Sequence, residues 1–316
     1  MADLNLMPQI RALETGTIWQ PAGGLFALEG TTYPGAPFDP VPLTDNHYEY
    51  EQWSGFASGT VGAVINMADG LLHCECVGYP ALTANMGASA LIGAQNLALR
   101  IDAFAKAFFA QFGFFPPIWI VTWSQGAWAF ALFWRIYVLP EDGALHYLMD
   151  FMTSVYNYGD VFRRSGTSRG NDYAGLPKPG TVDGDVDGGI AGPEQLTQAE
   201  TDIISKIDGR YVIKSFNRHG DLYGDAPMGA DPETKMPAAG IVEYSYFKDI
   251  EKTGFFSIIV NFMGGVLHVI GDAEAAANVI KFFGAGTNAP HYQYWDEMSW
   301  VANDIVQTAS ALPHQL

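Results

Sequence analysis

Cysteine and positive charge are both scarce in this sequence, and each scarcity argues against a class of protein. The 316 residues contain only two cysteines, Cys74 and Cys76. Two cysteines one residue apart point the same way from a strand and cannot close a long loop, so we expect no disulfide framework. The 16 Lys and Arg against 34 Asp and Glu give a formal net charge of −18, which repels phosphate backbones and anionic membranes. We therefore expect no nucleic-acid partner and a neutral substrate.

Charged residues of either sign are few, and the stretch between Lys106 and Arg135 has none. Gly113, Pro116 and Pro117 interrupt this stretch, so it predicts a helix, a turn, a buried strand and a second helix rather than a membrane span. The N-terminus lacks a basic segment followed by an apolar run. We therefore expect neither a secretory signal nor a transmembrane segment.

Apolar residues make up 48% of the chain, which is typical of one packed domain. Short apolar runs predict buried strands, and longer periodic runs predict helices. The alternation of the two predicts an α/β fold with a mostly parallel sheet covered on both faces. The predicted strands are residues 25–28, 71–79, 118–122 and 211–216, and the predicted helices are 88–112, 127–139 and 198–206.

Two further regions differ from this alternating pattern. Residues 163–195 are rich in Gly, Pro and Asp and predict a long irregular loop. Residues 227–285, loop as far as 239 and mainly helical and apolar from about 244, are interpreted as a subdomain inserted into a single domain of residues 1–316.

The most informative segment is residues 119–127. A short apolar strand runs into Ser124, Gln125 and Gly126 and then directly into an apolar helix. This is the context of a nucleophile elbow, in which a sharp turn lifts the serine hydroxyl above the sheet edge. The backbone N–H of Gln125 would lie at a helix N-terminus, where it can stabilise an oxyanion. An ordinary serine N-cap before a buried helix is the alternative interpretation.

A catalytic serine needs a general base and a carboxylate that orients the base, and in α/β-hydrolases the chain order is Ser, Asp or Glu, then His. Asp221 follows the predicted strand 211–216 and is the candidate acid. His291, in a Gly- and Pro-rich loop near the C-terminus, is the candidate base. His219 is the only other serious candidate, because His268 lies in an apolar helix and His314 in the tail.

Taken together, these segments resemble the mycobacteriophage lysin B family, the cutinase-like esterases that cleave mycolic acid from arabinogalactan. The resemblance covers most of the chain and rests on the order and spacing of residues 29–31, 78–81, 123–127, 188–193, 220–223 and 290–291. It implies a cutinase-like α/β-hydrolase fold in which Ser124, Asp221 and His291 form the catalytic triad. It also implies an oxyanion hole at Thr31 and the Gln125 N–H, and identifies the inserted helical block with a linker subdomain over the active site.

Two positions depart from the family pattern. Thr122 replaces the usual glycine two residues before the nucleophile, and Glu29 stands where the family more often has a histidine. A carboxylate near the oxyanion hole would oppose the negative charge that develops there, which leaves room for reduced activity.

The resemblance implies a serine esterase, encoded by a phage and made in the host cytoplasm, that acts on lipid esters of the host cell envelope after release. A virion component, such as a tail-tip protein that keeps the scaffold with little or no catalysis, is the first alternative. A cutinase or lipase acting on other lipids is the second, because the fold does not determine the acyl group.

A mycolyl ester carries a very long acyl chain and needs a wide apolar groove. Aromatic and methionine side chains of the inserted block are candidates for lining it, although they are more typical of the block's own core. They are Phe255, Phe256, Phe262, Met263, Phe282 and Phe283.

Two other motifs have the residue types of metal sites. Asp183, Asp185, Asp187 and Glu194 have the spacing of an EF-hand loop, but no helix precedes the loop and Pro193 adjoins the glutamate. Residues 73–76, His-Cys-Glu-Cys, would send the two thiols to one side of a strand and the His and Glu to the other, so buried free thiols are expected. The glycine-rich segments lack the contexts that hold phosphates. We therefore expect no metal and no cofactor.

Overall fold

The computed structural model describes residues 21–31, 47–48 (backbone only), 55–83, 85–178, 186–252 and 285–312. Within them, six strands form one sheet in the order β2-β3-β1-β4-β5-β6. All neighbouring strands are parallel except β2 and β3. The predicted α/β class with a mostly parallel sheet is confirmed. The strands are β1 (Gly24–Leu28), β2 (His47–Tyr48), β3 (His73–Val77), β4 (Ile118–Trp123), β5 (Met152–Tyr158) and β6 (Ile213–Phe216).

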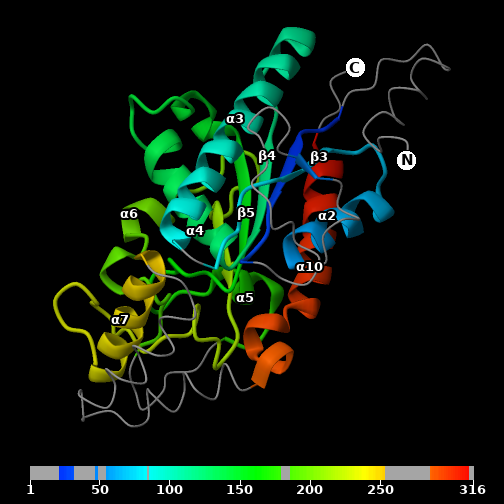
Figure 1. Ribbon diagram of the computed structural model, residues 1–316. Helices are drawn as coiled ribbons and strands as arrows, with labels where there is room; N and C mark the ends of the chain where they lie inside the picture. Colours follow the sequence, from blue (N-terminus) through cyan, green and yellow to red (C-terminus); the bar gives the residue numbers. More distant parts are fainter. Residues whose placement is uncertain are drawn as a thin grey trace.

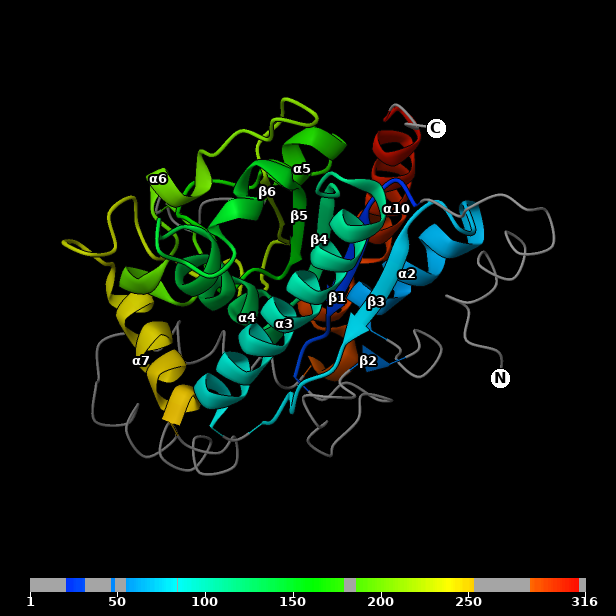
Figure 2. The same cartoon turned by 90° about the horizontal axis from the view of Figure 1, so that it is seen from above.

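Helices cover both faces of the sheet: α3 and α4 lie on one face and α2 and α10 on the other (Figures 1 and 2). The α-helices are α2 (Phe56–Met67), α3 (Met86–Phe112), α4 (Gln125–Phe133), α5 (Arg169–Ala174), α6 (Gln198–Thr201), α7 (Ala238–Lys252) and α10 (Trp295–Ser310). A π-helical turn η3 (Trp134–Val138) extends α4, and short 3-10 turns lie at η4 (His146–Phe151), η5 (Gly192–Glu194), η6 (Gly286–Asn288) and η7 (Pro290–Tyr292). No helix in the described part of the chain is long and apolar enough to cross a membrane.

The central strands are apolar on both faces because each face has its own core. Phe26 and Leu28 of β1 belong to the core beneath α3 and α4, whereas Leu25 and Ala27 belong to the core beneath α2 and α10. Successive side chains of a strand point to opposite faces, so a strand covered on both sides reads as a continuous apolar run. This is why the sequence predicts β1 and β4 closely.

The predictions fail at short elements that depend on distant contacts and at two longer helices. The predicted irregular loop 163–195 contains α5, which packs on β6: a Cβ at Gly170 would lie 2.6 Å from the Phe216 ring. The predicted helix 198–206 ends at Thr201, because the following residues turn to pair with residues 210–212, as in the 2.9 Å bond from Val212 N to Ile203 O. Sequence reasoning also omitted α2, β5 and α10.

The inserted block is described only in part. Its α7 packs on the domain core through Phe247, whose ring lies 4.8 Å from that of Trp128 on α4. Residues 253–284, which include the six side chains predicted to line an acyl groove, lie outside the described residues. The boundaries of the block therefore stay a prediction.

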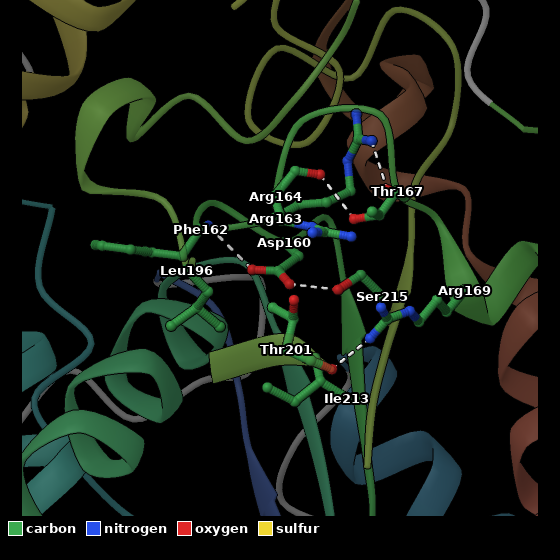
Figure 3. Close-up of a pocket in the computed structure, with 10 residues that line it drawn as sticks. All are labelled: Asp160, Phe162, Arg163, Arg164, Thr167, Arg169, Leu196, Thr201, Ile213 and Ser215. Atoms are coloured by element: carbon green, nitrogen blue, oxygen red, sulfur yellow. Dashed lines mark hydrogen bonds between the residues drawn. The ribbon is translucent and has the colours of Figure 1, made fainter. Parts of the chain in front are cut away.

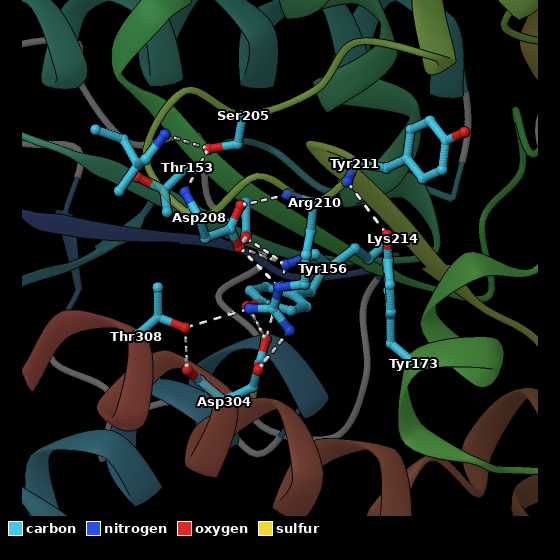
Figure 4. A network of polar contacts seen from close by, with 12 residues as sticks. Thr153, Tyr156, Tyr173, Ser205, Asp208, Arg210, Tyr211, Lys214, Asp304 and Thr308 are labelled. Atoms are coloured by element: carbon cyan, nitrogen blue, oxygen red, sulfur yellow. Dashed lines mark hydrogen bonds and ion pairs between the residues drawn. The ribbon is translucent and has the colours of Figure 1, made fainter. Parts of the chain in front are cut away.

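A buried ion network joins α10 to the sheet (Figure 4). Lys214 of β6 is fully buried, and its Nζ lies 3.3 Å from Asp208 and 3.7 Å from Asp304 of α10. Arg210 makes two bonds to Asp304, at 2.8 and 3.0 Å, and the Tyr156 hydroxyl donates to the same carboxylate at 2.6 Å. Two cations thus balance two carboxylates. We call Asp208, Arg210, Lys214, Asp304 and Tyr156 the ion network.

Candidate active site

The turn between β4 and α4 has the backbone of a nucleophile elbow. Ser124 has φ 56° and ψ −117°, a region that a residue with a Cβ rarely occupies and that costs on the order of 1–3 kcal/mol. Gly126 lets the helix approach β1, since a Cβ there would lie 2.3 Å from the carbonyl oxygen of Leu28. An ordinary N-cap residue has extended φ and ψ and accepts a bond from the first turn, whereas the Ser124 side chain makes no capping bond. The N-cap interpretation therefore does not account for this conformation.

Thr122 is accommodated within the sheet. Its hydroxyl donates to Asn157 Oδ1 of the neighbouring strand β5 at 2.7 Å, and its side chain is fully buried. Asn157 in turn donates to Asp160, which also accepts from Ser215 at 2.5 Å (Figure 3). Burial raises the pKa of Asp160 although these bonds oppose it. The pocket beside Asp160 measures about 10 Å³, room for a single water rather than for a substrate.

The structure brings Asp221 and His291 together across 70 positions of the sequence. His291 Nδ1 donates to both carboxylate oxygens of Asp221, at 2.9 and 3.0 Å, and both side chains are buried. Burial alone would raise the pKa of Asp221, but the charge and hydrogen bond of His291, with the Tyr294 hydroxyl and the Tyr223 N–H, hold it below its ordinary value. Asp221 is therefore an anion that fixes the imidazole tautomer with Nδ1 protonated.

His291 also lies beside the residue that precedes Ser124. The Trp123 indole N–H donates to the backbone oxygen of His291 at 3.2 Å, and the two ring centroids are 5.5 Å apart. On the other side the Tyr223 ring packs 4.8 Å from the imidazole. Since β4 and β6 are separated by β5 alone, their carboxyl ends place residues 124 and 221 at the same edge of the sheet.

Two residues that contact this pair were missed by sequence reasoning. Gly159 has φ +55°, and a Cβ there would lie 2.7 Å from the imidazole of His291 and 3.0 Å from Asp221. The Tyr294 hydroxyl donates to Asp221 Oδ2 at 2.5 Å. A glycine directly after a strand was the available signal for Gly159, and it went unread because β5 was not predicted. No local pattern distinguishes Tyr294 from a core tyrosine.

His219, the competing histidine, contacts a different carboxylate. Its side chain is 68% exposed, and its Nδ1 lies 3.1 Å from Asp225. Asp225 also accepts the Gly220 N–H at 2.6 Å and, through its own N–H, bonds the Asp221 carbonyl at 2.7 Å. His219 and Asp225 thus belong to the loop that carries Asp221, and the histidine that bonds Asp221 is His291.

The two residues predicted for the oxyanion hole lie side by side. The Thr31 hydroxyl donates to Gln125 Oε1 at 3.4 Å, and the Gln125 amide donates to the backbone oxygen of Met86 at 3.1 Å. Gln125 is the first residue of α4, where a backbone N–H has no acceptor within its own helix. That N–H is suited to bind an anion next to Ser124.

The Glu29 carboxylate is directed to the start of α2. It accepts from Ser58 N at 2.7 Å and from Ser58 Oγ at 2.5 Å, and a Cβ at Gly55 would lie 1.9 Å from one of its oxygens. Burial raises the pKa of Glu29 although the Ser58 bonds oppose it. Because the helix dipole and these donors offset its charge, Glu29 gives less reason for reduced activity than the sequence suggests.

The metal-like motifs are occupied by protein contacts. On β3, His73 Nε2 lies 2.7 Å from Glu75, which also pairs with Arg100 at 2.6 Å, while Cys74 and Cys76 are buried free thiols, as predicted. In the EF-hand-like stretch, Glu194 accepts from Lys248 at 2.7 Å and Asp187 pairs with Arg163 at 3.2 Å. Asp183 and Asp185 lie outside the described residues. Among the described residues, no cluster of three metal-ligating side chains is present.

A cavity of about 420 Å³ adjoins the loops that carry Asp221 and His291. Pro290 immediately precedes His291, and Arg218 and His219 precede Asp221. Amide, carboxylate and basic side chains, including Asn288, Gln293 and Asp296, line it together with Leu176 and two prolines.

The fold has counterparts among solved structures. The crystal structure of lysin B from mycobacteriophage D29 matches over 90% of this chain and 99% of its own, with 18% identity and a TM-score of 0.57. A cutinase-like protein from Cryptococcus sp. (16% identity, 73% of this chain and 95% of that chain) and an acetylxylan esterase (18%, 73% and 99%) reach TM-scores of 0.40. No protein-family model and no curated protein matches the sequence. The chain has the α/β-hydrolase fold seen in phage lysin B.

Proposed function

We propose that this protein is a serine carboxylic ester hydrolase in which Ser124, His291 and Asp221 act as nucleophile, base and orienting acid. The observation that carries the proposal is the strained elbow at Ser124 combined with a buried His–Asp pair at the same sheet edge. Backbone strain of this kind persists only where the surrounding structure enforces it, and it is concentrated at functional sites.

The chemistry follows from the roles of these groups. His291 takes the Ser124 proton as the hydroxyl attacks the ester carbonyl, and the alcohol leaves with that proton when the tetrahedral intermediate collapses. Water, activated by the same imidazole, then hydrolyses the acyl-enzyme. Asp221 stabilises the imidazolium that forms in each half of the reaction. The Gln125 N–H binds the oxyanion with Thr31 beside it, and an oxyanion donor is worth about 3 kcal/mol.

For the substrate, we propose the ester between mycolic acids and arabinogalactan in the mycobacterial envelope, with the protein encoded by a phage and acting on its host. The resemblance of the sequence to the lysin B family and the shared fold support this choice. The hydrogen-bonding side chains that line the 420 Å³ cavity, among them Asn288, Gln293 and Asp296, suit a polyhydroxy alcohol on the leaving side of the ester. The long acyl chain needs an apolar groove, for which the inserted block stays the candidate.

The test compares the wild type with Ser124→Ala, using a fluorophosphonate probe, a p-nitrophenyl ester and purified mycolyl-arabinogalactan. We expect the wild type alone to be labelled, and the substitution to lower turnover by about ten-thousand-fold or more. Equal labelling of both forms would remove Ser124 from the mechanism. Hydrolysis of the p-nitrophenyl ester without release of mycolic acid would favour a cutinase or lipase acting on other lipids.

The virion-component alternative predicts a folded protein that neither reacts with the probe nor turns over any ester. Of the two departures that favour it, Thr122 is hydrogen-bonded within the sheet and Glu29 within the start of α2. Both side chains therefore have protein partners of their own, which weakens the argument for lost catalysis.

A further inference from the structure

Apart from His291, the described side chain that hydrogen-bonds the proposed acid, Asp221, is that of Tyr294. Its hydroxyl donates to Asp221 Oδ2 at 2.5 Å, a length typical of O–H donors on a carboxylate. An ionised carboxylate can only accept, so the hydroxyl proton is directed to Asp221.

The ring of Tyr294 is held as firmly as its hydroxyl. It is fully buried and packs edge-on against Phe56 at 5.8 Å and tilted against Tyr158 at 5.8 Å. The Arg218 guanidinium lies 5.9 Å over the ring and pairs with Glu297 at 2.7 Å. A side chain locked on every side can position its partner precisely.

The carboxylate of Asp221 is consequently shared among three donors. Oδ1 accepts the Tyr223 N–H at 3.0 Å, Oδ2 accepts the Tyr294 hydroxyl, and both accept His291 Nδ1. The charged and titratable groups around this cluster are Arg218, Glu297, Tyr223 and Tyr158. A hydrogen bond from a neutral hydroxyl draws negative charge toward itself, so less is left to stabilise the imidazolium.

We propose that Tyr294 is a positioning residue that orients Asp221 and moderates how strongly this carboxylate favours the protonated form of His291. The inference rests on the proposed function, and it assigns Tyr294 no contact with substrate. According to this proposal, the hydroxyl of Tyr294 rather than its ring determines the effect on Asp221 and His291.

The experiment compares Tyr294→Phe with Tyr156→Phe. Tyr156 is a matched control, because its buried hydroxyl donates to the carboxylate of Asp304 at 2.6 Å in the ion network. Both variants lose one buried hydroxyl-to-carboxylate bond, so both should lose similar thermal stability. Two readouts are followed: the pH dependence of kcat/KM on a p-nitrophenyl ester, and the NMR titration of the imidazole at residue 291.

For Tyr294→Phe we expect kcat to fall about tenfold and the acid limb of the profile to move to higher pH, with the imidazole titrating at the same higher midpoint. For Tyr156→Phe neither should move. An unshifted midpoint in Tyr294→Phe, or an equal shift in Tyr156→Phe, overturns the proposal.

The NMR readout does not require turnover, so it tests Tyr294 even if Ser124→Ala shows that the proposed function is wrong. Should Tyr294→Phe fail to fold, 3-fluorotyrosine at position 294 keeps the ring and strengthens the hydroxyl as a donor. The midpoint should then move to lower pH, and a shift to higher pH or no shift contradicts the inference.

Discussion

Two buried polar clusters of this protein use similar groups for different ends. The ion network contains two carboxylates and two cations. The attraction between these paired charges offsets the free energy that is lost when they are removed from water. The site cluster has one carboxylate, a titratable imidazole and, at Ser124, a strained backbone. Both clusters join β6 and the loops that flank it to the C-terminal segment that contains α10. In this protein the cluster with equal numbers of positive and negative charges stabilises the fold. The cluster with unequal charges, which neighbouring residues hold in place, contains the groups that can react.

The largest effect in the ion network is expected from Lys214→Met. The change leaves the largely buried Asp208 and Asp304 with Arg210 as the only cation that pairs with them among the described residues, and breaking a buried pair costs about 3–5 kcal/mol. Chemical denaturation would measure the loss, while kcat per folded molecule should stay unchanged. Lys206→Met, which removes the exposed pair with Asp150, is the control and should change stability by less than about 0.5 kcal/mol. Equal effects of the two changes would mean that the network does not stabilise the fold.

The site cluster should respond to Gly159→Ala with a loss of activity. A methyl group at this position meets the imidazole of His291 at 2.7 Å, so the ring must move away from its aligned geometry. We expect kcat/KM to fall about 100-fold, because small misplacements of catalytic groups have effects of that order. Steady-state kinetics on a p-nitrophenyl ester would measure it.

Gly175→Ala is the matched control for that change. Gly175 has a similar φ of +64°, but nothing lies within 4 Å of the added methyl. It should cost about 1 kcal/mol of stability through backbone strain alone and leave kcat/KM unchanged. If both alanines lowered activity equally, strain rather than contact with His291 would be the cause.

A smaller effect is expected at Asp225, which supports the loop carrying Asp221. Burial and the neighbouring Asp187 raise its pKa to about 9. This folded-state pKa lies above the unfolded value of 3.8, so folding takes up a proton at pH values between 3.8 and about 9. Stability therefore falls as the pH rises through this range. Asp225→Asn keeps a neutral side chain, so we expect it to be more stable than the wild type at pH 8.

The measurement is the melting temperature of wild type and Asp225→Asn from pH 5 to pH 9. The advantage of the variant should grow steadily with pH across this range. Asp142→Asn, at an exposed position, should follow the wild type throughout. A constant difference between Asp225→Asn and the wild type would show that Asp225 does not take up a proton on folding.

Sequence reasoning predicted the elements whose signals are local. β1 and β4 are continuous apolar runs, and α3 has helical periodicity over its whole length, so each was placed within a few residues. Short elements were missed or misjudged: α5 lies in a predicted loop because its packing on β6 is not encoded locally. β5 was missed because its Thr, Ser and Asn side chains obscure the apolar pattern, although all of it is buried.

The candidate site shows the same division. The elbow at Ser124, the order of Ser, Asp and His, and the pairing of Asp221 with His291 were predicted, and the last agrees with a hydrogen bond. The roles of Gly159 and Tyr294 were not predicted, because these roles depend on which side chains meet across the sheet edge. The expectation about Glu29 changed for the same reason, since its neighbour Ser58 is brought close only by folding.

The sequence by itself determined the α/β class, the strand–serine–helix turn and the candidate chemistry, because residue types and short spacings decide these. Only the tertiary structure decided which group the carboxylate of Glu29 contacts and which tyrosine hydroxyl donates to the proposed acid. Those outcomes depend on contacts between segments some 30 to 70 or more positions apart, and the free energy of each contact exists only when the sheet and its two covering layers are assembled.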